Sequence, residues 1–258
     1  MKHIQNKTVF ITGASAGIGK ACAFAFAEAG ANLILTARRF GMLESLKAEI
    51  LSKHQVQVDT YELDVTSNAK VTQLIEQLQK GNRTIDILLN NAGLALGVDH
   101  LKEGNPEHWD VVIDTNIKGL LYTTRALLPV MIKNGGGHII NLGSVAGREV
   151  YPGGNVYCAT KFAVNALTQA LRIELINDNI RVTTVDPGMV ETDFSKVRFF
   201  NDTERAANVY KGIHALTPED IAETVLFCAS RPPHVQICDV VITPAKQASV
   251  HFIVKDQA

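Results

Sequence analysis

A tyrosine and a lysine stand four residues apart in a segment whose apolar residues recur with helical spacing. Tyr157 and Lys161 lie in the run Asn155 to Asn177, where small and apolar side chains return every three or four positions. This spacing puts both side chains on one helix face, with their Cβ atoms roughly 5–6 Å apart. A free phenol has a pKa near ~10, so it needs a nearby positive charge to act as a base at neutral pH. The pair therefore predicts a tyrosine that exchanges a proton, with Lys161 supplying charge beside it.

A glycine-rich loop near the N-terminus predicts a phosphate-binding site. It follows the apolar run Thr8 to Thr12 directly, and a helical pattern begins near Lys20. Glycine lets the backbone turn tightly and approach a pyrophosphate, which binds the unpaired N–H groups and the positive end of the next helix. Strand, loop and helix in this order predict a dinucleotide site. The residues expected to line it are Gly13, Ser15, Ala16, Gly17, Ile18 and Gly19.

The residues after the second apolar run indicate which dinucleotide is bound. A site for NAD is expected to carry a carboxylate here, where it binds the ribose hydroxyls. The sequence instead reads Thr36-Ala37-Arg38-Arg39. Two guanidinium groups can bind a 2′-phosphate through charge-assisted hydrogen bonds, and no carboxylate repels it. The pattern favours NADP(H); the alternative is that Arg38 and Arg39 are only the solvated start of a helix.

These features occur together in the short-chain dehydrogenase/reductase family, which the sequence resembles over nearly its whole length. The glycine spacing G-x-x-x-G-x-G is typical of that family. The other motifs follow in family order and are Asp64-Val65, Asn90-Asn91-Ala92-Gly93, Asn116, Ser144, Tyr157-Cys158-Ala159-Thr160-Lys161 and Pro187-Gly188. The resemblance implies an oxidoreductase that transfers hydride between a nicotinamide cofactor and an alcohol or carbonyl carbon.

The resemblance also implies a catalytic tetrad of Asn116, Ser144, Tyr157 and Lys161. In this family the tyrosine exchanges a proton with the substrate oxygen, and the serine donates a hydrogen bond to the same oxygen. The lysine hydrogen-bonds the nicotinamide ribose, and its charge and that of the oxidised nicotinamide favour the phenolate. The asparagine is expected to hold a water that links the lysine to solvent.

Further residues are expected along the cofactor because of the same resemblance. Asp64 and Val65 should bracket the adenine ring, with the Asp64 carboxylate accepting its exocyclic amine. The turn Asn91-Ala92-Gly93 should lie along the adenosine ribose. The residues expected around the nicotinamide carboxamide are Pro187, Gly188, Val190 and Thr192, the last through its hydroxyl.

Strand-length apolar runs alternate with helical stretches about seven times, and these elements must position the site. The runs are Thr8 to Thr12, Asn32 to Thr36, Val56 to Leu63, Ile85 to Leu89, His138 to Leu142, Arg181 to Val185 and Cys238 to Thr243. Several are almost continuously apolar, as expected of a sheet with helices on both faces. We expect one α/β domain over residues 1–258, a Rossmann-like doubly wound sheet of about seven mainly parallel strands. A substrate loop at about 193–215 and a tail at about 244–258 interrupt the alternation.

Composition narrows the class of function. With 258 residues, 46% of them hydrophobic, the chain can bury a core without disulfides or metals. Its 25 basic and 26 acidic residues give no overall attraction to nucleic acid or to an anionic membrane. The four scattered cysteines indicate reduced thiols in the cytoplasm, and we find neither a secretory signal nor a membrane span. The eight dispersed histidines indicate no metal site, so we expect a small-molecule substrate.

Within the family, the sequence most resembles the NADP-dependent 3-hydroxy acid dehydrogenases, which include serine and allo-threonine dehydrogenases and related semialdehyde reductases. Residues 91–97, 114–119, 153–157, 197–199, 215–220 and 244–249 carry this resemblance. Such substrates have a carboxylate, which requires a fixed cation, and Arg148 and Arg198 are the candidates. Tyr151, Phe199 and Phe200 could narrow the pocket.

One departure and one further implication go with this resemblance. Residues 188–194 lack a glycine that some bacterial members carry, so the loop and the substrate preference can differ. The family also implies a homotetramer, with the helices Asn116 to Asn134 and Asn155 to Asn177 at a shared interface.

Two other functions stay open. One is a reductase for a bulkier uncharged ketone, aldehyde or steroid, with the same tetrad and a different substrate loop. The other is a non-catalytic NADP-binding sensor. The intact Ser144, Tyr157 and Lys161 argue against the sensor, because a sensor has no need of a proton donor beside a lysine.

Overall fold

A computed structural model, which describes residues 3–255, contains one parallel sheet of seven strands. The strands are β1 (Thr8–Thr12), β2 (Asn32–Ala37), β3 (Val58–Glu62), β4 (Ile87–Asn90), β5 (Gly137–Leu142), β6 (Ile180–Pro187) and β7 (Asp239–Ile242). Their order is β3-β2-β1-β4-β5-β6-β7, and every neighbouring pair is parallel. The predicted Rossmann-like fold class is confirmed.

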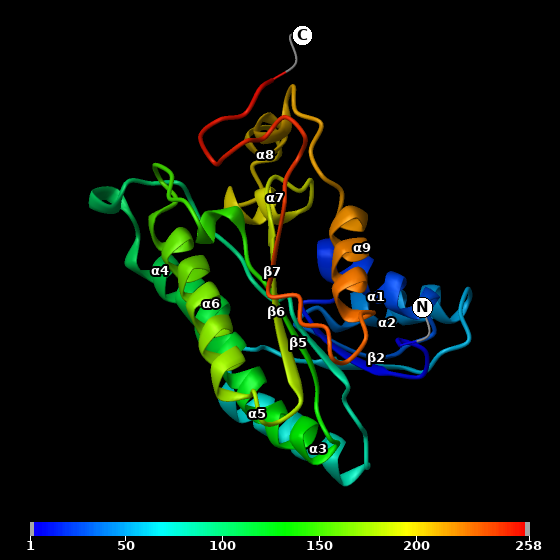
Figure 1. Ribbon diagram of the computed structural model, residues 1–258. Coiled ribbons are helices and arrows are strands. Elements are labelled where there is room, and N and C mark those ends of the chain that lie inside the picture. The colour runs from blue at the N-terminus through cyan, green and yellow to red at the C-terminus, as the bar shows by residue number, and fades with distance from the viewer. Residues whose placement is uncertain (1–2, 256–258) are drawn as a thin grey trace.

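Helices cover both faces of the sheet (Figure 1). They are α1 (Gly17–Glu28), α2 (Phe40–Leu51), α3 (Asn68–Lys80), α4 (Pro106–Ile113), α5 (Gly119–Lys133), α6 (Asn155–Glu174), α7 (Phe194–Arg198), α8 (Thr203–Tyr210) and α9 (Pro218–Ala229). In Figure 1, α1, α2 and α9 lie on one side, and α3, α5 and α6 on the other. Short turns are η1 (Leu101–Glu103), η2 (Asp114–Lys118) and η3 (Val145–Gly147).

Alternation along each buried strand divides the apolar core in two. In β1, Val9 and Ile11 pack with α1 and α9, whereas Phe10 packs on the opposite face with α3 and α5. All three side chains are fully buried. Such strands have near-continuous apolar sequences because successive side chains enter different cores. The sheet is therefore packed on both faces, and ligands bind at its carboxyl edge in folds of this kind.

The strand order reverses between the neighbouring strands β1 and β4, which makes this the topological switch point of the sheet. Two segments lie beyond the carboxyl ends of the strands on that side: the pair α7 and α8, and the tail after β7 (Figure 1). They correspond to the two regions in which the sequence interrupts the alternation of strands and helices. Their place in the fold puts them over the expected ligand site.

The segment around Asn116 differs from the expectation that this residue lies near the start of a helix. A helix begins earlier, at Pro106, because the Asn105 side chain accepts the Glu107 N–H and proline suits the first helical position. It continues through the π-helical turn η2, which contains Asn116, into α5. A π turn is a wider turn that often marks a functional site. Likewise, α1 begins at Gly17 and not near Lys20.

His138 is a buried histidine in β5, at the edge of the sheet remote from the expected ligand site. Its Nε2 atom lies 2.7 Å from the Thr183 hydroxyl of β6, and its Nδ1 atom has no hydrogen-bond partner in the described part of the chain. Burial lowers the pKa of His138 well below its usual value, and the Arg181 charge lowers it further. The folded protein therefore holds a neutral imidazole.

We expect this histidine to weaken the fold in mild acid. Below about pH 6.5 the unfolded chain binds a proton that the folded protein does not, so stability falls by up to about 1.4 kcal/mol per pH unit. Urea unfolding of the wild type and His138→Gln at about pH 7.5 and about pH 5.5 measures this. The wild type should lose more stability than the variant between the two pH values. Equal losses would contradict a neutral buried His138.

Candidate active site

A cavity of about 630 Å³ opens at the carboxyl edge of the sheet. Most residues expected in the site line it, and these are Gly13, Ser15, Ala16, Gly17, Ile18, Arg38, Arg39, Asp64, Val65, Asn91, Ala92, Gly93, Ser144, Tyr157, Lys161, Pro187, Gly188, Val190, Thr192 and Arg198. Gly19, Asn116 and Arg148 lie outside the lining. One continuous cavity thus joins the expected nucleotide site to the expected catalytic residues.

The glycine loop has the shape required to bring backbone N–H groups to a ligand. Gly13 and Gly17 adopt φ of +66° and +53°, which side chains disfavour. A Cβ on Gly19 would lie 2.5 Å from both Asn91 Nδ2 and the Gly13 carbonyl oxygen. Ala16 caps α1 without a side-chain hydrogen bond. The first turn of α1 therefore keeps N–H groups that an anion can accept.

Thr12 joins the ends of β1 and β4 beside this loop. Its hydroxyl accepts the Asn91 and Ala92 N–H groups, each at 3.0 Å. The Asn91 amide donates in return to the Thr12 carbonyl at 2.9 Å. Sequence reasoning missed this role of Thr12, although a threonine that ends a strand before a glycine loop is a usable signal. The bonds fix the switch point at which the cavity begins.

Two arginines stand where β2 reaches the cavity. Arg39 donates to the Ser15 hydroxyl, with its Nη2 atom at 3.0 Å, and Arg38 is exposed at the cavity edge. Neither guanidinium forms an ion pair with a carboxylate within 4 Å among residues 3–255. Both therefore remain able to bind a phosphate group.

Asp64 follows β3 on the same side of the cavity. Burial raises the pKa of Asp64, but hydrogen bonds from Thr66 and the charges of Arg38 and Lys70 lower it more, so the net shift is downward. Both Thr66 bonds, from the N–H and the hydroxyl, go to Oδ1. The carboxylate stays ionised and is a suitable acceptor for an exocyclic amine.

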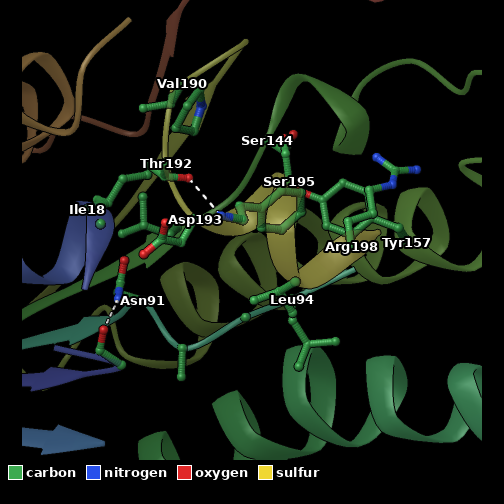
Figure 2. A pocket seen from close by; sticks show the side chains of 18 of the residues that line it. Ile18, Asn91, Leu94, Ser144, Tyr157, Val190, Thr192, Asp193, Ser195 and Arg198 are labelled. Atoms are coloured by element: carbon green, nitrogen blue, oxygen red, sulfur yellow. Dashed lines mark hydrogen bonds between the residues drawn. The ribbon is translucent and has the colours of Figure 1, made fainter. Parts of the chain in front are cut away.

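Ser144, Tyr157 and Lys161 meet at the other end of the cavity, where Figure 2 shows Ser144, Tyr157 and Arg198 close together. Ser144 comes directly after β5 and Gly143, and its hydroxyl accepts the Ala146 N–H at 3.0 Å. Lys161 is buried in α6, with Nζ 5.9 Å from the centre of the Tyr157 ring. The structure thus brings Ser144, at the end of β5, next to the face of α6 that carries Tyr157 and Lys161.

Lys161 is hydrogen-bonded to the end of β5, the strand that Ser144 follows. Its Nζ atom donates to the Leu142 carbonyl at 2.8 Å. Burial lowers the pKa of Lys161 to about 8, against the opposing charge of Asp186. The ammonium is thus the major form at neutral pH, and it titrates within an accessible range.

The protein groups around Tyr157 favour its neutral, protonated phenol. Burial raises the pKa of Tyr157, and nearby Tyr151 raises it further. A hydrogen bond with Ser144 and the charge of Arg198 lower it by less. This differs from the expectation that Lys161 is the chain's main group favouring the phenolate. A neutral phenol in contact with the cavity is a proton donor.

Asn116 connects two segments behind the catalytic residues. Its Oδ1 accepts the Leu94 N–H, and its Nδ2 donates to the Leu94 carbonyl, both at 2.9 Å. Nδ2 also lies 3.0 Å from the Thr160 hydroxyl of α6. These bonds hold the loop after β4 against the helix that carries Tyr157 and Lys161.

The two arginines expected to hold a carboxylate have different surroundings. Arg148 pairs with Asp186, at 2.6 Å, and lies outside the cavity lining. Arg198 donates to the Gly97 carbonyl and to the Tyr151 hydroxyl, and its buried Nη2 atom has no hydrogen-bond partner within residues 3–255. Its guanidinium carbon lies 5.8 Å from the centre of the Tyr157 ring. Arg198 therefore lines the cavity next to Tyr157 and keeps one donor that no described group accepts.

Other walls of the cavity come from the substrate loop and the tail. Tyr151 and Phe199 line it as expected, whereas Phe200 is exposed and packs on His108. Gln247, Val250 and Ile253 of the tail also line it, and the side-chain Oε1 atom of Gln247 accepts the Met189 N–H at 2.9 Å. Sequence reasoning marked this tail as a departure from the fold pattern and not as a wall of the site.

Neither a metal centre nor a membrane helix is found in the part of the chain that the structure describes. Residues 3–255 contain no group of three or more His, Cys, Asp or Glu that could hold a metal ion. No described helix is both long enough and apolar enough to cross a membrane.

Comparison with known proteins agrees with the site geometry. The NADP-dependent 3-hydroxy acid dehydrogenase of Schizosaccharomyces pombe is 46% identical, over 100% of both chains. The sulfoacetaldehyde reductase of Chromohalobacter salexigens is 42% identical, over 95% of this chain and 97% of its own. The solved closed form of a serine dehydrogenase complexed with NADP+ matches with a TM-score of 0.90 and 41% identity, over 97% of this chain and 100% of the other. The family model for short chain dehydrogenases matches residues 7–202, so the protein belongs to the short-chain dehydrogenase family.

Proposed function

We propose that this protein is an NADP(H)-dependent oxidoreductase that acts on the CH–OH group of a small 3-hydroxy acid, such as serine or allo-threonine. In reverse it reduces the matching semialdehyde or ketone. The observation that carries this proposal is the buried, unpartnered Nη2 atom of Arg198 beside Tyr157. A buried cation with a spare donor is satisfied best by a carboxylate. The 3-hydroxy acid dehydrogenase and serine dehydrogenase relatives support this substrate class.

The cofactor half of the cavity fits NADP(H). The first turn of α1 and the glycine loop offer N–H groups to a pyrophosphate. Arg38 and Arg39 are placed to bind a 2′-phosphate, and Asp64 to accept the adenine amine. Around the nicotinamide carboxamide we assign Pro187, Gly188, Val190 and Thr192. When bound, NADP(H) supplies or takes up the hydride.

Tyr157 serves as the general acid and base. In reduction, its neutral phenol donates a proton to the substrate oxygen as negative charge develops there. The Ser144 hydroxyl donates a hydrogen bond to the same oxygen. In oxidation the phenol must first lose its proton, and the ammonium of Lys161 stabilises that form.

Lys161 and Asn116 support the tyrosine. Lys161 hydrogen-bonds the nicotinamide ribose, in keeping with its burial at the cavity wall. Gly93 lies between the two side chains: a Cβ there would be 3.3 Å from Asn116 Oδ1 and 3.8 Å from Lys161 Nζ. The absence of a side chain at Gly93 leaves space for the water by which Asn116 connects Lys161 to solvent.

A small sulfonated aldehyde is a second candidate substrate. A sulfonate presents several oxygens to a guanidinium, as a carboxylate does, and a relative 42% identical is named a sulfoacetaldehyde reductase. Arg198 can bind either the carboxylate or the sulfonate, and neither candidate substrate requires Arg148.

We also propose that the chain acts as a single domain in a cytoplasmic homotetramer. The shared interface would be the outer face of α5 and α6, where large apolar side chains are exposed. They are Leu121 and Ile132 of α5, Phe162 and Ile173 of α6, and Ile176 just after α6; Ile173 and Ile176 are about three-quarters exposed, at 75% and 76%. Burial of such a patch against another subunit removes it from water.

Tyr157→Phe tests the proton step. The variant keeps the ring that contacts Phe194 but lacks the hydroxyl. We expect kcat to fall by roughly 10²- to 10⁴-fold, which is the usual contribution of general acid–base catalysis. Fluorescence titration should give an NADPH Kd close to that of the wild type. Turnover near the wild-type rate would exclude Tyr157 as the proton donor.

Replacing both arginines after β2 tests the cofactor choice. Arg38→Ala/Arg39→Ala removes two charge-assisted contacts to the 2′-phosphate, so the Kd of NADPH should rise by about 10- to 100-fold or more. The Kd of NADH should change little, because NADH has no 2′-phosphate. An unchanged ratio of the two dissociation constants would show that these arginines do not select the cofactor.

Arg198→Ala tests the carboxylate contact. For a 3-hydroxy acid, KM should rise by roughly 10- to 100-fold, and for an uncharged alcohol of similar size it should change much less. Arg205→Ala, which removes an exposed arginine stacked on Phe199, is the matched control in the same loop. A panel with carboxylate, sulfonate and uncharged substrates separates the candidate activities. Equal losses on all three would refute anion binding by Arg198.

A further inference from the structure

Asp186 is a buried carboxylate directly behind the catalytic residues. It lies in β6, is 0% exposed, and does not line the cavity. It packs so closely against β5 that a Cβ on Gly143 would lie 1.7 Å from its Oδ1 atom. An isolated buried charge is strongly unfavourable, so its partners determine its state.

Both carboxylate oxygens bind the turn that begins at Ser144. Oδ1 accepts the Ser144 N–H at 3.2 Å. Oδ2 accepts Arg148 Nε at 2.7 Å and lies 2.6 Å from Arg148 Nη2. The carboxylate thus holds the residue before η3 and the residue after it, which fixes the main chain of Ser144 against the sheet.

The buried lysine binds the same end of β5 against which this carboxylate packs. Lys161 donates to the carbonyl of Leu142, the residue before Gly143, and Asp186 is the charge that favours its ammonium form. Burial raises the pKa of Asp186, whereas Arg148 and Lys161 lower it and Asp239 of β7 raises it. The groups around Asp186 are therefore two cations, from η3 and α6, and one acid from β7.

We propose that Asp186 is a positioning residue for the reaction: it fixes the Ser144 main chain and acts as the buried counter-charge that keeps Lys161 protonated, with Arg148 as its clamp. This rests on the proposed function for the roles of Ser144 and Lys161. Arg148 then acts through Asp186 and not on the substrate. The proposal concerns the proton chemistry of the site, so pH dependence distinguishes it from a purely structural role.

The test is the pH profile of kcat in the reductive direction. Lys161 has a pKa of about 8 and that of Tyr157 is higher, so loss of the Lys161 proton sets the alkaline limit of activity. Asp186→Asn keeps the shape and an acceptor for Ser144 but removes the charge. The pKa of Lys161 should fall, which moves the alkaline limb down by about one pH unit and reduces kcat at pH ~8 by roughly 5-fold. Much of the loss should be recovered in mild acid.

Further variants separate the charge effect of Asp186 from a purely structural role. Arg148→Met removes a cation that competes with Lys161 for the charge of Asp186. The alkaline limb of the kcat profile should therefore move to higher pH, opposite to its shift in Asp186→Asn. Asp239→Asn, which removes a carboxylate bound to Arg172 and Thr184, is the control and should leave the limb in place. If Asp186→Asn folds poorly, judged by NADPH titration, the neutral pair Asp186→Asn/Arg148→Gln should show the same downward shift.

The inference is overturned if the limb does not move in Asp186→Asn or in the neutral pair. It is also overturned if Asp186→Asn and Arg148→Met move the limb in the same direction. Such results with an active wild type would leave the proposed function intact. Absence of reductase activity in the wild type on every substrate of the panel would instead remove the proposed function itself.

Discussion

The hydrogen bond from Lys161 to the Leu142 carbonyl joins the two elements on which the proposed catalytic site depends. Leu142 ends β5, and Ser144 follows two residues later; Lys161 lies in α6, one helical turn after Tyr157. Fixing this lysine against the strand end therefore fixes the tyrosine relative to the serine. Because all strands are parallel, the glycine loop after β1 ends at the same edge as this pair. The cofactor and catalytic halves of one cavity follow from that geometry.

Charge is distributed unevenly over the cavity, and this gives each end its ligand. Among the described residues, Arg38 and Arg39 stand at the expected nucleotide end without an ion pair to a carboxylate, and Arg198 stands at the expected reaction end with one buried donor unsatisfied. Arg148 is instead paired with Asp186 behind the wall. A cation whose donors are already bonded gains little from a substrate, whereas one with a buried free donor gains a full charge-assisted bond. The pairing of these arginines, and not their number, indicates an anionic substrate.

Local spacing was enough to predict the parts of the site that lie on one element. The i, i+4 pair of Tyr157 and Lys161 and the glycine loop are each set by a single helix or turn, and the apolar runs located the strands to within a few residues. Contacts between distant segments could not be predicted this way. Asp186 is 38 residues from Arg148, so nothing near Arg148 showed that it was already paired. The pKa of Tyr157 likewise depends on burial and on Tyr151 and Arg198, which come from separate segments.

A crystal structure with NADP+ and a 3-hydroxy acid bound tests the central claim most directly. The account predicts that the substrate oxygen lies within hydrogen-bond reach of both the Tyr157 and Ser144 hydroxyls, next to the reactive nicotinamide carbon. It also predicts the substrate carboxylate on Arg198 and the 2′-phosphate between Arg38 and Arg39. A nicotinamide ring bound outside the cavity, or a Tyr157 hydroxyl turned away from the substrate oxygen, would contradict it.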